Sequence, residues 1–151
     1  MIMNSQRVPQ QTSADVNARI EQEMRARIAR FRNASPAVIS QRLAELEQEW
    51  DIERILQANA ATVSLLGITL GATQDRRWFI LPALVGGFLL QHAVQGWCPP
   101  LGAFRRMGIR TQREIDEERF ALKVLRGDFR HVDNDDAHLA STEAVLRSVQ
   151  R

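Results

Sequence analysis

Charged residues are spread very unevenly along the chain. Two runs contain no Asp, Glu, Lys or Arg: Ile55 to Gln74, which is 20 residues long, and Trp78 to Phe104, which is 27 residues long. They read ILQANAATVSLLGITLGATQ and WFILPALVGGFLLQHAVQGWCPPLGAF. A helix of about 20 apolar residues crosses the hydrocarbon core of a bilayer. The pattern therefore predicts two membrane spans, at about 55–72 and 78–98.

The residues around these runs support a membrane hairpin over 55–98. The charged triplet 75–77 separates the runs, and Trp78 and Trp97 bracket the second, as an interfacial aromatic belt would. Two prolines, at 99 and 100, are expected to end the second helix. The alternative is a soluble protein that buries both helices. A chain of 151 residues offers too little surrounding structure to enclose two of them.

Polar and small residues inside the spans suggest how the helices pack. Antiparallel spans bring one group of polar side chains to a similar depth: Gln57, Asn59, Gln91, His92 and Gln95. An unpartnered amide is costly in lipid, so we expect these groups to face one another or a second copy. Close helix approach is expected at the glycines, which are Gly67, Gly71, Gly86 and Gly87. They could serve packing within one hairpin or a homodimer seam.

Apolar residues outside the spans recur at helical spacing. Before the spans, segment 13–54 has two such stripes, formed by Val16, Ile20, Met24, Ile28 and Phe31, then by Ile39, Leu43, Leu46 and Trp50. Ser35 and Pro36 fit the N-cap and first position of the second helix. After the spans, Thr111 and Glu114 form a capping box that predicts a helix over about 112–126, ended by Gly127.

These elements divide the chain into five expected regions. They are a disordered N-terminus (1–12), amphipathic helices (13–54), the hairpin (55–98), a segment containing one helix (99–130) and a weakly ordered tail (131–151) with a weak helix at about 137–149. The opening residues, MIMNSQRVPQQ, contain no apolar run, so we expect no signal peptide there.

Basic residues near the spans predict the orientation. The loop between the spans carries two arginines, whereas the flanks carry six: Arg42, Arg54, Arg105, Arg106, Arg110 and Arg113. Because basic residues favour the cytoplasmic side, both termini are expected in the cytoplasm.

Composition narrows the choice of partner and of chemistry. Twenty basic residues against 18 acidic ones argue against a nucleic-acid partner, which would need a clear basic excess. One cysteine excludes an intramolecular disulfide and an all-cysteine zinc site. The chain has no phosphate-binding GxxxxGK[ST] loop and no HExxH motif.

The acidic and histidine-containing segments are not expected to be reactive. We interpret the stretch 133–136, flanked by His131 and His138, as a solvated linker rather than a metal site. Glu117 and Glu118 are interpreted as a solvated helix face rather than a catalytic pair. No catalytic residue, cofactor or metal is expected.

Cys98 is the one candidate reactive group. It lies at the end of the second span beside Trp97, and Arg105 and Arg106 would favour its thiolate. Such a thiol could be acylated, persulfidated or oxidised. The simpler interpretation is a small apolar residue at the membrane interface.

Several of these residues resemble a known family. A second span that ends Gly96-Trp97-Cys98-Pro99, after 51–54 (Asp-Ile-Glu-Arg) and before 107–108 (Met-Gly), is similar to the YgaP-like inner-membrane transmembrane domain of bacteria. The resemblance covers about residues 50–110. It implies location in the bacterial inner membrane and a hairpin able to form a homodimer. Some members add a rhodanese domain, but the first 50 residues here are too short for one and contain no cysteine, so sulfurtransferase activity is not expected.

The sequence as a whole predicts an all-α membrane protein, a two-helix transmembrane hairpin flanked by amphipathic cytoplasmic helices. The favoured function is non-enzymatic: a homodimer in contact with membrane lipid that docks a protein partner through its cytoplasmic helices. The alternatives are a sulfur or redox accessory that uses Cys98 as an acceptor thiol, and a small regulator of a larger membrane complex.

Overall fold

The computed structural model describes residues 7–129, and all regular structure in that range is helical. The elements are α1 (Arg7–Gln10), α2 (Ala14–Arg30), α3 (Pro36–Gln48), α4 (Ile52–Thr73), the 3-10 helix η1 (Arg76–Phe79), α5 (Ile80–Gln95), α6 (Pro99–Arg106) and α7 (Gln112–Arg126). The expected all-α class is confirmed. The tail 131–151, with its expected helix, lies outside the described residues.

The chain forms two compact units. In the described part of the chain, the first, called the hairpin unit, contains residues 7–22 and Trp50–Glu114. The second, called the helical unit, contains Glu23–Glu49 and residues 115–129. Two unit boundaries fall within α2 and α7, and the third falls between α3 and α4. Each unit has its own apolar cluster.

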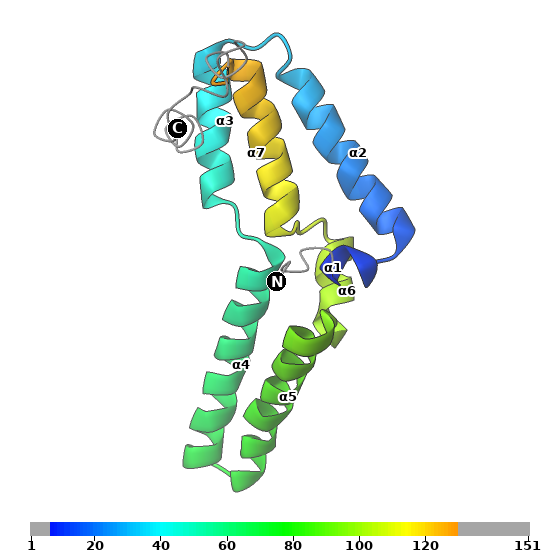
Figure 1. Cartoon of the computed structure of the whole chain (residues 1–151). Helices are drawn as coiled ribbons and strands as arrows, with labels where there is room; N and C mark the ends of the chain where they lie inside the picture. Colours follow the sequence, from blue (N-terminus) through cyan, green and yellow to red (C-terminus); the bar gives the residue numbers. More distant parts are fainter. Residues whose placement is uncertain (1–6, 130–151) are drawn as a thin grey trace, which may run out of the picture. The chain divides into compact units, whose positions relative to one another are not determined.

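In the hairpin unit, α4 and α5 lie side by side and run in opposite directions (Figure 1). The carboxylate of Asp51 caps α4 by accepting a hydrogen bond from the Arg54 N–H at 2.6 Å. Asp75 caps η1 in the same way through the Arg77 N–H at 2.8 Å. The turn between the two spans is therefore short and locally stabilised.

The surface of the hairpin is apolar. Large exposed side chains on α4 and α5 include Leu65, Leu66, Ile68, Ile80, Leu84, Phe88, Leu90 and Val94. The stretch that contains α4 and the stretch formed by η1 and α5 are both long and apolar enough to cross a membrane. A core helix of a soluble protein would bury most of these side chains, whereas a membrane helix presents them to lipid.

Two glycines of α4 allow α5 to approach closely. A Cβ added at Gly67 would lie 2.6 Å from Cδ of Pro82 and 3.1 Å from Cβ of Leu81. At Gly71 an added Cβ would lie 2.9 Å from the ring of Phe79. The two glycines therefore pack within one hairpin, which is one of the two uses expected from the sequence.

The helical unit has a small apolar core between α3 and α7, which lie side by side (Figure 1). Its buried members are Ile39, Leu43, Leu46, Ile115 and Leu122. Ser35 caps α3 as predicted, because its Oγ accepts the Val38 N–H, and Pro36 occupies the first turn.

Glu118 corrects one sequence interpretation. The sequence analysis placed it on a solvated face, but it is fully buried. It lies three residues after Ile115 and four before Leu122, so it shares the core face of α7. Its carboxylate accepts hydrogen bonds from Arg27 at 3.1 Å and from Arg42 at 3.0 and 3.1 Å. A buried carboxylate is tolerated because these two guanidinium groups compensate its charge.

The end of the second span also differs from expectation. The spanning helix stops at Gln95, where Gly96 adopts a left-handed conformation with φ 75°. Pro99 and Pro100 then begin α6 instead of ending a helix, because proline in a first helical turn forfeits no hydrogen bond. The other difference is α1, since residues 7–10 were placed in a disordered segment but form a helix with Val8 buried.

The glycine contact predicts a destabilising substitution. Gly67→Ala should lower the free energy of unfolding of the hairpin by about 1–3 kcal/mol, because the proline ring facing it cannot move aside. Gly102→Ala is the control, since an added Cβ there meets nothing within 4 Å. The measurement is thermal unfolding in detergent micelles. Equal melting temperatures for the two variants would contradict the close approach of α4 and α5.

Candidate functional site at the base of the hairpin

The base of the hairpin is a layer of packed side chains around the start of α4, at the opposite end of α4 from the turn that joins the two spans. Its buried apolar residues are Val8, Ile52, Leu56, Cys98 and Leu101. The Ile52 N–H donates a hydrogen bond to the Arg110 carbonyl at 2.9 Å, so α4 is joined to the loop that precedes α7. Segments from both ends of the hairpin unit therefore meet here.

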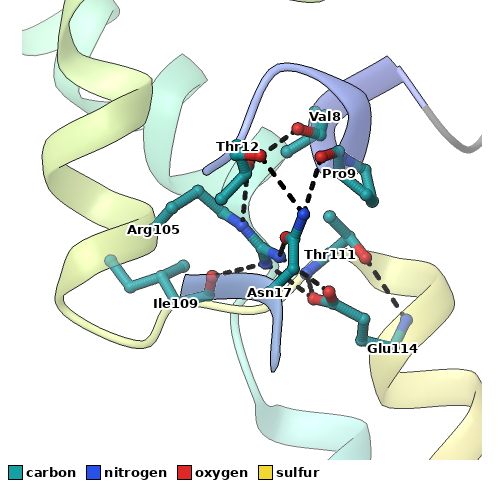
Figure 2. Close-up of polar contacts among 8 residues, drawn as sticks. All are labelled: Val8, Pro9, Thr12, Asn17, Arg105, Ile109, Thr111 and Glu114. Carbon is teal, nitrogen blue, oxygen red and sulfur yellow. Dashed lines mark hydrogen bonds and ion pairs between the residues drawn. The ribbon is translucent and has the colours of Figure 1, made fainter. Parts of the chain in front are cut away.

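A fully buried arginine, Arg105 of α6, forms the polar centre of this layer (Figure 2). Its Nε donates to Oγ1 of Thr12 at 3.2 Å. Its Nη1 donates to the Ile109 carbonyl at 3.1 Å and to Oε2 of Glu114 at 2.7 Å. Its Nη2 donates to Oδ1 of Asn17 at 2.9 Å and to Oε1 of Glu114 at 2.8 Å. All five N–H groups of the guanidinium are thus used.

Glu114 connects this centre to the start of α7. The capping box expected from the sequence is confirmed, because the Thr111 N–H donates to Oε2 of Glu114 at 2.8 Å and the Glu114 N–H donates to Oγ1 of Thr111 at 3.3 Å. Burial acts to raise the pKa of Glu114. Hydrogen bonds from Arg105 and from Thr111 outweigh burial, so this pKa lies below its ordinary value.

Two further hydrogen bonds hold the partners of Arg105 in place. The Thr12 hydroxyl donates to the Val8 carbonyl at 2.7 Å, and Nδ2 of Asn17 donates to the Pro9 carbonyl at 2.8 Å. Figure 2 shows these contacts around the guanidinium. The centre holds no free acid, base or nucleophile, and its geometry fits a structural role that joins α1, α2, α6 and α7.

Sequence reasoning missed this arginine. In the sequence analysis, Arg105 served as one of the flanking basic residues that predict orientation and as a cation that would favour the Cys98 thiolate, but not as a buried structural group. The one local signal is that Arg105 lies between the second charge-free run and the Thr111–Glu114 capping box. The Glu114 carboxylate has two oxygens, so it can accept hydrogen bonds from an arginine as well as from the helix start.

The polar residues of the spans do not gather as a single group. Nδ2 of Asn59 donates to the Ile55 carbonyl of its own helix at 2.9 Å. His92 is buried, and its Nε2 lies 3.4 Å from Oε2 of Glu53. Gln57 and Gln95 are exposed and Gln91 is half-buried. Among the residues that the structure describes, no hydrogen bond joins these five side chains to one another.

The threonine hydroxyls of the first span are satisfied locally. Thr62, Thr69 and Thr73 each donate to the carbonyl four residues earlier, at 2.7–2.8 Å. This bond lets a threonine face lipid without an unpaired donor. The polar content of α4 is therefore compatible with a membrane span.

The second glycine pair lies in open space. A Cβ added at Gly86 or Gly87 would meet nothing within 4 Å, and both residues are exposed. They take no part in the seam formed by Gly67 and Gly71.

Cys98 is buried among apolar side chains, with 3% of its surface exposed. It lies beyond Gln95, where the spanning helix ends. Burial raises the pKa of the thiol, and the charge of Glu53 adds to that effect. The expected help from Arg105 is not found, because the guanidinium bonds elsewhere. The environment therefore favours the neutral thiol.

No group of three or more His, Cys, Asp or Glu side chains suited to a metal ion occurs within residues 7–129. The segment with His131 and His138 lies outside that range.

The Arg105–Glu114 pair predicts a pH effect on stability. Folding lowers the pKa of Glu114 below its ordinary value of 4.5, so the ionised carboxylate stabilises the fold above pH 4.5. This stability is lost as the pH falls through the lower pKa of the folded state. Glu114→Gln should therefore melt at a lower temperature at neutral pH and lose less stability below pH 4.5 than the parent protein. Glu21→Gln, on the exposed surface of α2, is the control. Identical acid profiles for the parent and Glu114→Gln would contradict the assignment.

Comparison with known proteins agrees with this geometry. Residues 51–114 match the family model described as "Inner membrane protein YgaP-like, transmembrane domain". The match begins at the cap of α4 and ends at Glu114, so it includes the hairpin, Cys98 and Arg105. No curated protein and no solved structure matches the chain. The resemblance seen in the sequence is thereby confirmed: the protein is a membrane protein that carries a YgaP-like transmembrane domain at residues 51–114.

Proposed function

We propose that this protein is a non-enzymatic component of the bacterial inner membrane, a homodimer that docks a protein partner through its cytoplasmic helices. The hairpin supplies the membrane anchor. The helical unit supplies the docking surface. The proposal rests chiefly on the two faces of α7.

One face of α7 is buried in the helical unit through Ile115, Glu118 and Leu122. A second face leaves Phe120 46% exposed and Val124 62% exposed. These two residues are four apart, so they lie next to each other on the helix. An exposed aromatic–aliphatic pair outside a completed core is typical of a surface that receives an apolar helix face.

The paired state of the buried charges supports a non-enzymatic role. Glu114 is held by Arg105, and Glu118 is held by Arg27 and Arg42. A catalytic acid or base needs a proton that it can exchange with substrate. The buried, neutral environment of Cys98 likewise favours docking over the alternative role as an acceptor thiol.

The charge pattern supports cytoplasmic termini. Arg76 and Arg77 are the arginines of the short turn, and six arginines flank the spans on the other side. An exposed helical unit on the cytoplasmic side would meet cytoplasmic partners or the cytoplasmic parts of other membrane proteins.

Photo-crosslinking in cells tests the docking surface. A photoreactive residue at Phe120 should give a discrete adduct with a protein other than this chain, because Phe120 is expected to lie within the contact. The same residue at Gln112, an exposed position of α7 about 80° away around the helix, should give little adduct. Reporter fusions after Thr73 and after Arg151 show on which side of the membrane the turn and the C-terminus lie, and the C-terminal fusion should report the cytoplasm. Equal labelling from both positions, or an external signal at Arg151, would overturn the proposal.

The outer face of α5 is the proposed dimer seam. Gly67 and Gly71 are already covered within the hairpin, which leaves Gly86 and Gly87 as the open small-residue surface. Gln91 follows Gly87 by one helical turn, so its amide could bond across the seam.

A bulky residue at this seam should separate the protomers. Gly87→Leu is expected to weaken dimerisation about tenfold, which corresponds to about 1.4 kcal/mol. Ala61→Leu, at an exposed position of α4, should leave dimerisation unchanged. The readout is energy transfer between labelled protomers in vesicles. Equal transfer in both variants would place the seam elsewhere, and no transfer in the parent protein would refute the dimer.

A further inference from the structure

Helix α6 has an inverted distribution of polarity. Its buried side contains Leu101, 1% exposed, and Arg105, fully buried. Its exposed side is formed by Pro99, Pro100, Gly102 and Ala103, with Arg106 as the single charge. A helix that faces water normally presents charged and polar groups there. An exposed face made of proline, glycine and alanine suggests an apolar surrounding instead.

The same conclusion follows from the length of the second charge-free run. The run extends from Trp78 to Phe104, but the spanning helix ends at Gln95. The nine residues after Gln95 lie outside that helix and still lack charge. Crossing the membrane does not require them. Packing in the base of the hairpin accounts for Cys98, Leu101 and Phe104, but the exposed members need another cause: Trp97, Pro99, Pro100, Gly102 and Ala103.

The packing of α6 places it at the edge of the hydrocarbon core. Leu101 of α6 belongs to the same buried cluster as Ile52 and Leu56, which lie at the start of α4. Val8 of α1 joins this cluster, in keeping with the position of α1 beside α6 (Figure 1). With 22 residues, α4 is about 33 Å long, close to the core thickness of about 30 Å. The start of α4, and α6 with it, therefore lies at a membrane boundary.

Aromatic residues mark the same level. Trp50, 46% exposed, precedes α4, and the Arg54 guanidinium lies 4.3 Å from the centre of its ring. Trp97, 39% exposed, precedes α6. Tryptophan is enriched at the level of lipid headgroups, where its ring meets the acyl chains and its N–H meets water.

Exposed apolar side chains also continue along the sequence from the spanning helix to the end of α6. Leu90 and Val94 are 67% and 68% exposed near the end of α5, Trp97 follows, and Met107 just after α6 is 74% exposed. We propose that α6 lies in the interfacial layer of the bilayer, with Pro99, Ala103 and Met107 toward the acyl chains. The Arg106 guanidinium extends to the headgroup phosphates. The membrane contact of this protein thus extends beyond its two spans.

Depth-dependent quenching tests this assignment. The full-length protein, with a small fluorescent amino acid at Ala103, is reconstituted into phosphatidylcholine–phosphatidylglycerol vesicles that contain nitroxide lipids. Ala61, exposed at the middle of α4, is the deep control. Glu47, exposed on α3 of the helical unit, is the aqueous control. A probe at Met107 provides a second reading from the same surface.

The probe at Ala103 should be quenched about threefold more by a nitroxide near the headgroup than by one near the chain end, because an interfacial helix lies only about 5–10 Å deep. The order should be reversed at Ala61. Quenching at Ala103 and Met107 as weak as at Glu47 would overturn the proposal, and would indicate that water or a protein covers α6. A chain-end preference at Ala103 would overturn it as well, by making α6 part of a span.

Discussion

The buried pair of Arg105 and Glu114 holds the base of the membrane hairpin together. A charge of either sign is costly to bury unless a partner and further hydrogen bonds compensate it. Here the guanidinium has every N–H satisfied, by Glu114, Thr12, Asn17 and the Ile109 carbonyl. Removing one member of such a pair typically costs about 3–5 kcal/mol. Two stretches that are distant in the sequence, around residues 8–17 and 105–114, therefore depend on one side chain for their mutual placement within the hairpin unit.

The helical unit is likewise stabilised by a buried charge that is compensated by groups of opposite charge, but there the buried group is negative. There the buried group is a carboxylate, Glu118, and two arginines from other helices compensate it. Among the residues that the structure describes, the cluster of each unit has five buried apolar residues. Cores of that size provide limited stability and little geometric specificity, so charge-assisted hydrogen bonds with fixed geometry contribute the remainder. The apolar surface outside these cores is then available to lipid at the hairpin, and the exposed face of α7 is the surface proposed for a protein partner.

The sequence predicted what depends on local pattern. Charge-free runs of sufficient length indicated the two spans, and the Gly-Trp-Cys-Pro end of the second indicated the family. Ser35 and the Thr111–Glu114 capping box predicted where α3 and α7 begin, because capping involves only neighbouring residues. The interpretation of Glu118 failed because a charged residue is assigned to the surface until its partners are known, and both partners are at least 76 residues away. Helix α6 was missed because a proline pair stops one helix and starts another equally well.

The central claim is that residues 52–95 form a hairpin inside the bilayer, fixed at its base by paired buried charges. Alkaline carbonate extraction of membranes from cells that express the full chain tests this most directly. Carbonate at high pH releases proteins held to a membrane by charge or by other proteins, but not helices that cross the acyl core. We predict that the protein stays in the membrane pellet. Release into the supernatant would contradict the account and restore the soluble helical hairpin as the explanation of both apolar runs.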